Sequence, residues 1–319
     1  MPDFIFVVNP VAGKGLHVQK LCDQIRNVFS ACGESFAIHL TRGTEDALDF
    51  VRSYPQQQGR SLCFVACGGD GTLHEVVNGA VGRQDCTVSV IPCGSGNDYV
   101  KNFSGIEAFS DLKRLANGRP CPVDLLDCSG EYAVNLCNIG FDARVAHHMS
   151  KFKKIPLVSG PLAYTLSLIF CLAGPVSSTV ALSFDGTDPV EEHLILAVAA
   201  NGFCYGGGYY PAPDACPADG MMEFCGIRKM SRLQMSQFIR IYKKGQHLKD
   251  SRLSEKILYH TGHSLTITGK RPLIVCLDGE IRKKQTFSVR LLPGALSFWL
   301  PDGANLAAQP LAAAAQPHI

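Results

Sequence analysis

The sequence predicts an α/β domain followed by an all-β domain, because the pattern of apolar residues changes after about residue 125. Before that point, short apolar runs alternate with segments of helical periodicity, which is typical of a parallel sheet covered on both faces. After it, strand-like runs follow one another between Gly, Asp and Pro turns, which is typical of an antiparallel sandwich. With 319 residues, 46% of them hydrophobic, the chain is long enough to give both domains a core.

The first domain is expected to span residues 1–125 and to be completed by residues 295–310, with the β-sandwich domain between them at 126–294. Its predicted strands are 4–9, 36–40, 62–67 and 88–91, and its predicted helices are 16–31, 45–54 and 73–81. In the second domain, strands are predicted at 132–136, 179–184, 194–200, 264–268, 273–277 and 286–292, with helices at 162–173 and 231–244. Because no low-complexity linker separates the domains, we expect them to pack around a shared cleft.

The overall composition narrows the classes of function. The formal net charge is +2, which gives no general positive field for binding nucleic acid. Fourteen cysteines occur without a Cys-x-x-Cys pair, so neither a zinc site nor a disulfide framework is expected. The apolar run 162–173 is too short for a membrane-spanning helix, which needs about 20 residues. The first residues carry no secretory signal pattern, and we therefore expect a cytoplasmic protein.

The most informative motif is Gly68-Gly69-Asp70-Gly71-Thr72, between a predicted buried strand and a predicted helix. Glycines at such a point let the backbone approach a phosphate closely and let its N–H groups converge on the anion. Asp70 would repel the phosphate unless a divalent cation or a bridging water lay between them. Thr72 is expected to cap the helix. A tight strand-to-helix turn with a structural Asp is the alternative interpretation.

Two further glycine loops follow predicted strands. Asn9-Pro10-Val11-Ala12-Gly13 follows the first strand, and Pro92-Cys93-Gly94-Ser95-Gly96-Asn97-Asp98 follows the fourth. The carboxyl ends of parallel strands share one edge of a sheet, where α/β proteins bind their ligands. Each loop alone could be an ordinary turn, but three of them at strand ends predict a single phosphate-binding site.

A pair of carboxylates, Asp278 and Glu280, flanks Gly279 between a predicted strand and the basic turn 281–284. One of them could accept the proton of an attacking hydroxyl while the other orients that hydroxyl or holds a cation. An Asp-Gly hairpin turn followed by charged residues is the alternative. The sequence does not choose which of the two carboxylates would be the base.

The segment 228–256 carries nine Lys and Arg residues against two acidic residues. Leu233, Phe238, Ile241 and Tyr242 lie among these cations on a predicted helix. A basic amphipathic surface suits transient contact with an anionic membrane, at about 1 kcal/mol per well-placed cation. A solvated helix face is the alternative, and the aromatic residues are too few to indicate nucleic-acid binding.

The three glycine loops, in this order and spacing, resemble the diacylglycerol kinase catalytic-domain family. This family includes soluble bacterial diacylglycerol and lipid kinases and is related to sphingosine and ceramide kinases. The resemblance covers nearly the whole chain, and its visible departure is Cys93 and Ser95 in a loop that usually reads Leu-Gly-Thr-Gly. It implies a Rossmann-like first domain of the NAD-kinase and phosphofructokinase type, a lipid substrate, and ATP and Mg²⁺ as cofactors.

The resemblance also implies roles for individual residues. The implied ATP contacts are Asn9, Pro10, Val11, Ala12, Gly13, Thr41, Gly68, Gly69, Asp70, Gly71, Thr72, Leu73, His74, Ser95, Asn97 and Asp98. The implied metal ligands are Asp70, Asp98 and Asp124 in a water-linked magnesium network, and the Cys216 carbonyl, Asp219 and the Met221 carbonyl around a structural magnesium. Asp278 or Glu280 would be the proton acceptor, and Asp70 would complete the catalytic set. Without the resemblance, Asp219-Gly220 is simply a turn.

The expected function is that of an ATP-dependent lipid kinase that works at the periphery of the membrane. Its acceptor would be a lipid hydroxyl, with diacylglycerol giving phosphatidic acid as the first choice. The alternatives are an NAD kinase, which shares the Gly-Gly-Asp-Gly-Thr signature, and a catalytically silent regulator that binds nucleotide or lipid on the same fold. The sequence leaves the lipid open, and leaves a homodimer open as well.

Overall fold

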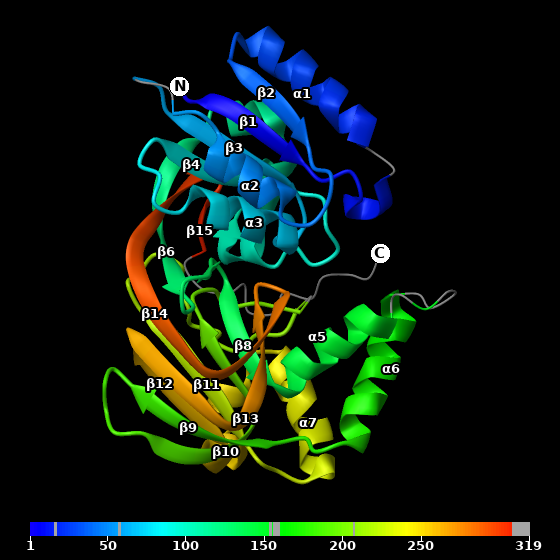
Figure 1. Ribbon diagram of the computed structural model, residues 1–319, viewed down its shortest axis with the longest axis vertical. Coiled ribbons are helices and arrows are strands. Elements are labelled where there is room, and N and C mark those ends of the chain that lie inside the picture. The colour runs from blue at the N-terminus through cyan, green and yellow to red at the C-terminus, as the bar shows by residue number, and fades with distance from the viewer. Residues whose placement is uncertain (16–17, 57–58, 153–154, 156–159, 207, 308–319) are drawn as a thin grey trace.

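Four strands near the N-terminus form the parallel part of a sheet, in the order β2-β1-β3-β4 (Figure 1). The computed structural model describes residues 1–319 apart from 16–17, 57–58, 153–154, 156–159, 207 and 308–319. The four strands are β1 (Asp3–Val8), β2 (Phe36–Leu40), β3 (Leu62–Gly68) and β4 (Cys86–Pro92). Every residue of β3 is buried, because a central parallel strand has helices on both of its faces.

The two faces of this parallel part carry different helices. These helices are α1 (Val18–Cys32), α2 (Asp46–Ser53), α3 (Asp70–Ala80) and α4 (Leu112–Ala116). Side chains alternate between the faces of a strand, so Phe4 and Phe6 of β1 pack against Phe29 of α1. Ile5 points to the other face and shares a core with Val77 of α3. The predicted helix start at residues 16–17 lies outside the described residues.

The remainder of the sheet is antiparallel and follows the order β12-β11-β10-β8-β13-β14. Its longer strands are β6 (Arg119–Asp127), β8 (Leu136–Gly140), β9 (Ser178–Phe184), β10 (Val190–Ala200), β11 (Met222–Arg228), β12 (Ile257–Gly262), β13 (Ser264–Leu277) and β14 (Glu280–Leu300). Three two-residue strands complete the set: β5 (Phe103–Ser104), β7 (Tyr132–Ala133) and β15 (Asn305–Leu306).

Three helices accompany the antiparallel part: α5 (Phe141–Phe152), α6 (Gly160–Ala173) and α7 (Arg232–Lys243). Val145 of α5 and Phe238 of α7 share a core with Ile195 of β10. The helix α7 begins with a capping box, in which the Ser231 side chain accepts from the Gln234 backbone and the Gln234 side chain accepts from the Ser231 backbone. These helices therefore pack on the antiparallel part, and Figure 1 shows them beside its strands, at the lower right.

The long strand β14 joins the two parts of the sheet. Its first half pairs with β13, its second half pairs with β6, and Phe298 near its end pairs in parallel with Val88 of β4. Figure 1 shows it running from the antiparallel part up to the parallel part. Beyond it, β15 pairs with β5, and residues 308–310 of the expected completing segment lie outside the described residues.

The chain after residue 118 differs from the sequence prediction in several elements. The runs 264–268 and 273–277 form one bulged strand, and 286–292 is the middle of another. The predicted strand 132–136 is instead broken between β7 and β8. The strands β6, β11 and β12 and the helix α5 have no counterpart in the prediction, because their mixed polar and apolar residues obscure the period of the pattern.

Candidate active site

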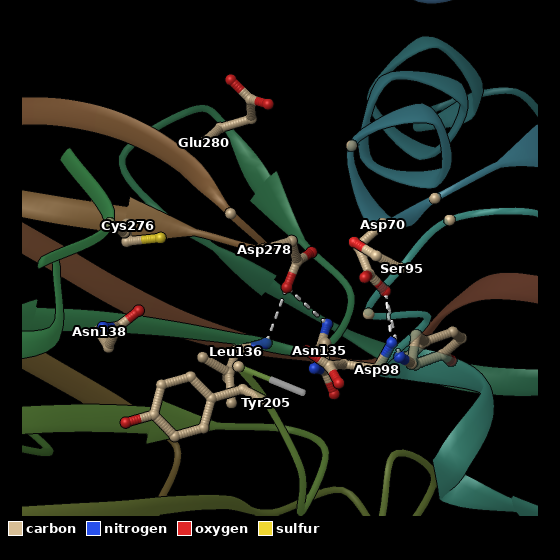
Figure 2. A pocket seen from close by; sticks show the side chains of 18 of the residues that line it. Asp70, Ser95, Asp98, Asn135, Leu136, Asn138, Tyr205, Cys276, Asp278 and Glu280 are labelled. Carbon is tan, nitrogen blue, oxygen red and sulfur yellow. Dashed lines mark hydrogen bonds between the residues drawn. The ribbon is translucent and has the colours of Figure 1, made fainter. Parts of the chain in front are cut away.

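A cavity of about 1110 Å³ lies between the carboxyl ends of the parallel strands and the antiparallel part, and both parts line it. One end is polar and is lined by the three glycine loops. The other end is lined by apolar and aromatic side chains of β10, α5 and α7, among them Phe141, Val145, Ile195, Met235 and Phe238. Figure 2 shows Asp70 and Ser95 on one side of this cavity and Asp278 and Glu280 on the other.

The three glycine loops pack directly on one another at the polar end. The Cys93 backbone donates to the Gly68 carbonyl at 2.8 Å, and the Asn9 side chain donates to the Thr72 hydroxyl at 3.1 Å. A side chain at Gly94 has no room, because a Cβ there would lie 2.5 Å from the Gly69 Cα. Close packing of these backbones therefore requires glycine at this point.

Thr72 does not cap the following helix as the sequence predicted. The helix already begins at Asp70, with Gly69 at the N-cap and no side-chain cap bond. Thr72 thus lies inside the first turn, where its hydroxyl accepts from Asn9 and ties the first and second glycine loops together. The first backbone N–H groups of α3, which have no partner within a helix, are directed to the same end of the cavity.

Asp70 and Asp98 meet at the junction of the second and third loops. The Asp70 Oδ1 accepts from the Asp98 backbone at 2.7 Å, and a Cβ at Gly96 would lie 2.8 Å from the Asp70 Oδ2 and 3.5 Å from the Asp98 Oδ2. Burial and then the negative charge of Asp98 raise the pKa of Asp70. Lys101 forms an ion pair with Asp98 at 2.5 Å. Two adjacent carboxylates of this kind favour a bound cation.

The carboxylate of Asp278 holds the chain where the predicted strand 132–136 breaks. Its oxygens accept three backbone hydrogen bonds, from Val134 at 2.7 Å, Asn135 at 3.1 Å and Leu136 at 2.9 Å. Figure 2 shows the bonds from Asn135 and Leu136. Asp278 itself has a positive φ of 46°. Because these N–H groups bond to the carboxylate instead of a neighbouring strand, the ladder is interrupted there.

His74 lies behind Asp278 and does not line the cavity. Its Nε2 is 3.1 Å from the Glu131 Oε1, and its Nδ1 is 3.8 Å from the Asp278 Oδ2, which is an ion-pair distance and too long for a hydrogen bond. Burial alone would lower the pKa of His74, but the two carboxylates raise it to about 9. His74 lowers the pKa of Glu131 in turn, with Arg282 as the second contributor. A protonated His74 therefore stabilises the Asp278 carboxylate by charge attraction from the side away from the cavity.

Glu280 has a different setting from its neighbour Asp278. Its side chain is 41% exposed, whereas that of Asp278 is 3% exposed. Its nearest cation is Arg282, 3.9 Å away, and a Cβ at Gly71 would lie 3.5 Å from the Glu280 Oε1. Glu280 thus projects toward the start of α3 and leaves its oxygens accessible from the cavity.

Most of the residues expected to bind nucleotide line this one cavity. They are Asn9, Pro10, Val11, Ala12, Gly13, Thr41, Gly69, Asp70, Gly71, Thr72, Leu73, Ser95 and Asp98. Gly68, His74 and Asn97 do not line it. Gly68 packs against Thr72, and the Asn97 side chain exchanges two 2.9 Å hydrogen bonds with the backbone of Gly94. These residues shape the site from behind the lining.

Asp124 holds the 216–221 loop through backbone hydrogen bonds. Its two oxygens accept from the backbones of Gly220 at 2.8 Å and Gly294 at 2.7 Å, and its own N–H donates to the Pro217 carbonyl. Burial and the nearby Asp124 charge raise the pKa of Asp219. None of Asp124, Cys216, Asp219 and Met221 lines the cavity. Asp70 and Asp98 thus meet at the cavity, Asp124 and Asp219 meet at the 216–221 loop, and the water-linked network that would join the two places stays a prediction.

Neither place has a complete set of metal ligands among the protein side chains. Within the described residues, no group of three or more His, Cys, Asp and Glu side chains is arranged to hold a metal ion. Mg²⁺ commonly takes only one or two carboxylates and completes its shell with water and substrate phosphates. Asp70 and Asp98 fit that requirement. At the other place, Asp219 already accepts from the Met221 backbone at 2.9 Å, which leaves its second oxygen for a cation.

The helix α7 presents its aromatic residues to the cavity. Phe238 and Tyr242 are 3% and 2% exposed and line the apolar end, whereas Leu233 is 73% exposed. The sequence prediction grouped all three with the cations of segment 228–256. In the structure, the buried face of the helix packs against β10 and α5. No helix in the described part of the chain has the length and apolarity needed to cross a membrane.

The polar lining residues missed from the sequence include Asn138, Asp142 and Tyr205. Asn138 and Asp142 interrupt the apolar run 136–142, and that interruption was the available signal. Tyr205 belongs to a distant loop, so only folding brings it to Asp142, to which its hydroxyl donates.

Comparisons with known proteins agree with this architecture. Residues 3–128 match the diacylglycerol kinase catalytic domain, and residues 135–300 match the YegS C-terminal NAD kinase beta sandwich-like domain. A diacylglycerol kinase of Bacillus subtilis (strain 168) is 26% identical over 281 residues, which is 86% of this chain and 88% of that protein. The crystal structure of a diacylglycerol kinase from Bacillus anthracis str. Sterne has the same fold, with a TM-score of 0.67 at 19% identity over 93% of this chain and 96% of that one. The chain therefore belongs to the diacylglycerol kinase catalytic-domain family.

Proposed function

We propose that this protein transfers the γ-phosphoryl group of ATP to a hydroxyl of a lipid, with diacylglycerol as the first acceptor to test and phosphatidic acid as its product. The observation that carries the proposal is the single cavity with a glycine-loop end and an apolar end. An ATP phosphate chain suits the first end and an acyl chain suits the second. The carboxylates Asp278 and Glu280 lie between the two, where the transferred group would be.

The glycine-loop end suits a triphosphate bound with magnesium. Loop backbones and the first N–H groups of α3 supply donors to phosphate oxygens, and the hydroxyls of Thr41 and Ser95 add to them. Asp70 and Asp98 would hold Mg²⁺ through their carboxylates and bound water. The ion would neutralise charge on the phosphates. Asp219 and Asp124 are the carboxylates for a second, structural ion.

Glu280 is the better candidate for the proton acceptor. The lipid hydroxyl oxygen would form a bond to the γ-phosphorus while the bond from that phosphorus to the β–γ bridging oxygen breaks and ADP leaves. The hydroxyl proton would pass to the Glu280 carboxylate, whose oxygens are accessible. Asp278 is already saturated by three backbone donors, so its proposed role is to position the β7–β8 connection and Glu280.

A cationic surface on and after α7 is the proposed membrane contact. Between residues 232 and 256, the exposed cations are Arg232, Arg240, Lys243, Lys244, Lys249 and Arg252. Leu233 lies among them and is 73% exposed. Sedimentation with phosphatidylserine-containing vesicles, compared with phosphatidylcholine alone, tests this surface. Equal retention on both vesicles would contradict it.

The decisive experiment for the reaction uses ATP labelled in its γ-phosphate with three separate acceptors: diacylglycerol in mixed micelles, NAD, and buffer alone. We expect label in phosphatidic acid, identified by mass, and its loss in the Asp70→Asn variant. Label in NADP alone would assign the NAD kinase alternative. ATP binding without phosphorylation of any lipid would indicate a regulator.

A further inference from the structure

A small polar cluster interrupts the apolar end of the cavity. Asp142 in the first turn of α5 accepts a hydrogen bond from the Tyr205 hydroxyl, which lies 3.3 Å from the Tyr242 hydroxyl. All three side chains line the cavity, among Phe141, Val145 and Ile195 in its apolar lining. The proposed transfer uses none of these groups, so their presence at this depth requires another explanation.

The Asp142 carboxylate is bonded by a tyrosine hydroxyl. Among the residues that the structure describes, no Lys, Arg or His forms an ion pair with its carboxylate, and Tyr205 is its one recorded side-chain donor. Burial raises the pKa of Asp142. A carboxylate removed from water is costly unless donors or a cation surround it. Its remaining oxygen is therefore matched to a donor that enters through the cavity.

Asn138 provides an independent observation of the same kind. It is 4% exposed and lines the cavity, and within the described chain its side-chain amide has no hydrogen-bond partner. With no partner in the described protein, this amide is left to bond water or a ligand inside the cavity. In Figure 2, Asn138 and Tyr205 lie on the side of Asp278 that is away from Asp70 and Ser95.

The path of the chain sets the order of these groups along the cavity. Leu136 donates to Asp278, and Asn138 follows two residues later on the same face of β8, about 6.6 Å further along the strand. The strand ends at Gly140, and Asp142 begins the next turn. A lipid whose hydroxyl meets Glu280 would pass Asn138 first and Asp142 second, before its chain enters the apolar end.

We propose that Asn138, Asp142 and Tyr205 form a subsite for a second hydrogen-bond-donating group, a hydroxyl or an amine, on the acceptor lipid. This inference rests on the proposed lipid kinase function and specifies its substrate class. Diacylglycerol has no donor besides the hydroxyl that would be phosphorylated, and its ester oxygens are acceptors that a carboxylate repels. A monoacylglycerol has a second hydroxyl, and a long-chain amino alcohol has an amine.

The experiment measures kcat/KM for diacylglycerol, a monoacylglycerol and a long-chain amino alcohol of matched chain length, all with saturating ATP. The wild-type protein is expected to favour one donor-bearing lipid over diacylglycerol by about tenfold or more, because a site built to bond a donor rejects the analogue that lacks it. The favoured lipid identifies the donor as a hydroxyl or an amine.

Two variants test the assignment of residues. Asp142→Asn removes the charge while keeping an acceptor for Tyr205, and is expected to lower the ratio of the favoured lipid to diacylglycerol by about 10- to 100-fold. Tyr205→Phe, which removes a single hydroxyl, should lower the same ratio less. Asp127→Asn is the matched control, because Asp127 pairs with Arg290 outside the cavity lining and should leave the ratio unchanged.

The inference is overturned if the wild-type protein prefers diacylglycerol, or if both variants leave the ratio within twofold. Failure of the underlying function looks different. In that case ATP would phosphorylate none of the three lipids, and the wild type and all variants would be equally inactive.

Discussion

Substitutions of Asp278 and Glu280, which are two residues apart, are expected to have different effects: the first should lower the stability of the fold, and the second should lower the rate of the reaction. Asp278→Asn keeps the oxygen that accepts from Asn135 and Leu136 but places an NH₂ group against the Val134 N–H and the protonated His74. One buried N–H then loses its acceptor, at about 1–3 kcal/mol, and the attraction of His74 is lost as well. We expect the free energy of unfolding to fall by about 2–4 kcal/mol.

Glu280→Gln is expected to have the opposite profile. The Glu280 side chain is 41% exposed and its nearest cation is 3.9 Å away, so its contribution to stability should be below about 0.5 kcal/mol. As a proton acceptor, however, it would contribute about 10²- to 10⁴-fold to the rate. We therefore expect kcat to fall by that factor while the KM for ATP and the unfolding curve stay close to those of the wild type.

The assay combines urea unfolding, followed by far-ultraviolet circular dichroism, with steady-state kinetics on the acceptor lipid. The outcome that refutes the reasoning is a reversal of the two profiles. If Glu280→Gln retains wild-type kcat, or if Asp278→Asn unfolds like the wild type yet has no activity, then Asp278 is the base and the assignment of the two carboxylates is wrong.

Three further substitutions address the rest of the site. Asp70→Asn should reduce kcat by about 100-fold or more while the protein stays folded, since Asn still accepts from the Asp98 backbone and repulsion between the carboxylates is relieved; near-normal turnover would remove Asp70 from the site. Gly94→Ala should destabilise the fold by about 1–3 kcal/mol and raise the KM for ATP, because the new Cβ would lie 2.5 Å from the Gly69 Cα; Gly174→Ala, where the nearest atom is 3.8 Å away, is the control and should leave both values unchanged. The pKa of His74 is raised to about 9, so its contribution to the free energy of unfolding is complete below about pH 6.5 and is lost as the pH rises through 9. The loss should be about 3 kcal/mol, at about 1.4 kcal/mol per pH unit. The His74→Gln variant should lack this fall between pH 7 and 9, and parallel curves of unfolding free energy against pH for the two proteins would contradict the prediction.

The parallel part of the fold was predictable because its signals are local. Each of its four strands is a short, fully or mostly apolar run, and each glycine loop follows a strand directly. The topology of parallel strands then brings loops that are far apart in sequence to one edge. Asp70 and Asp98 could be grouped in this way without coordinates. Asp124 could not, since it lies in the antiparallel β6, whose partners are set by β14 and the 216–221 loop.

The antiparallel part was less predictable because its elements depend on distant partners. The break after β7 exists because Asp278, more than 140 residues away, accepts the backbone N–H groups of Val134 to Leu136. The inward face of α7 likewise depends on β10 and α5, so the spacing of Phe238 and Tyr242 could not distinguish a cavity wall from a membrane-binding face. Local periodicity identifies an amphipathic helix but not what its apolar face contacts.

The same dependence on distant partners explains why the polar groups at the apolar end of the cavity could not be predicted from the sequence. The glycines around Asp70 form a motif that identifies it as a site residue from the sequence. Asp142 and Tyr205 are 63 residues apart and belong to no such motif. Their meaning comes from position: a carboxylate and an amide inside an apolar cavity must be paired with something, and within the described chain only Tyr205 bonds Asp142. Glycine loops bind the phosphates of the nucleotide, which are the same whatever the acceptor is, so these loops do not identify the acceptor. The acceptor must be selected by groups that differ from one lipid to another, and Asn138 and Asp142 are the polar groups placed to make that selection.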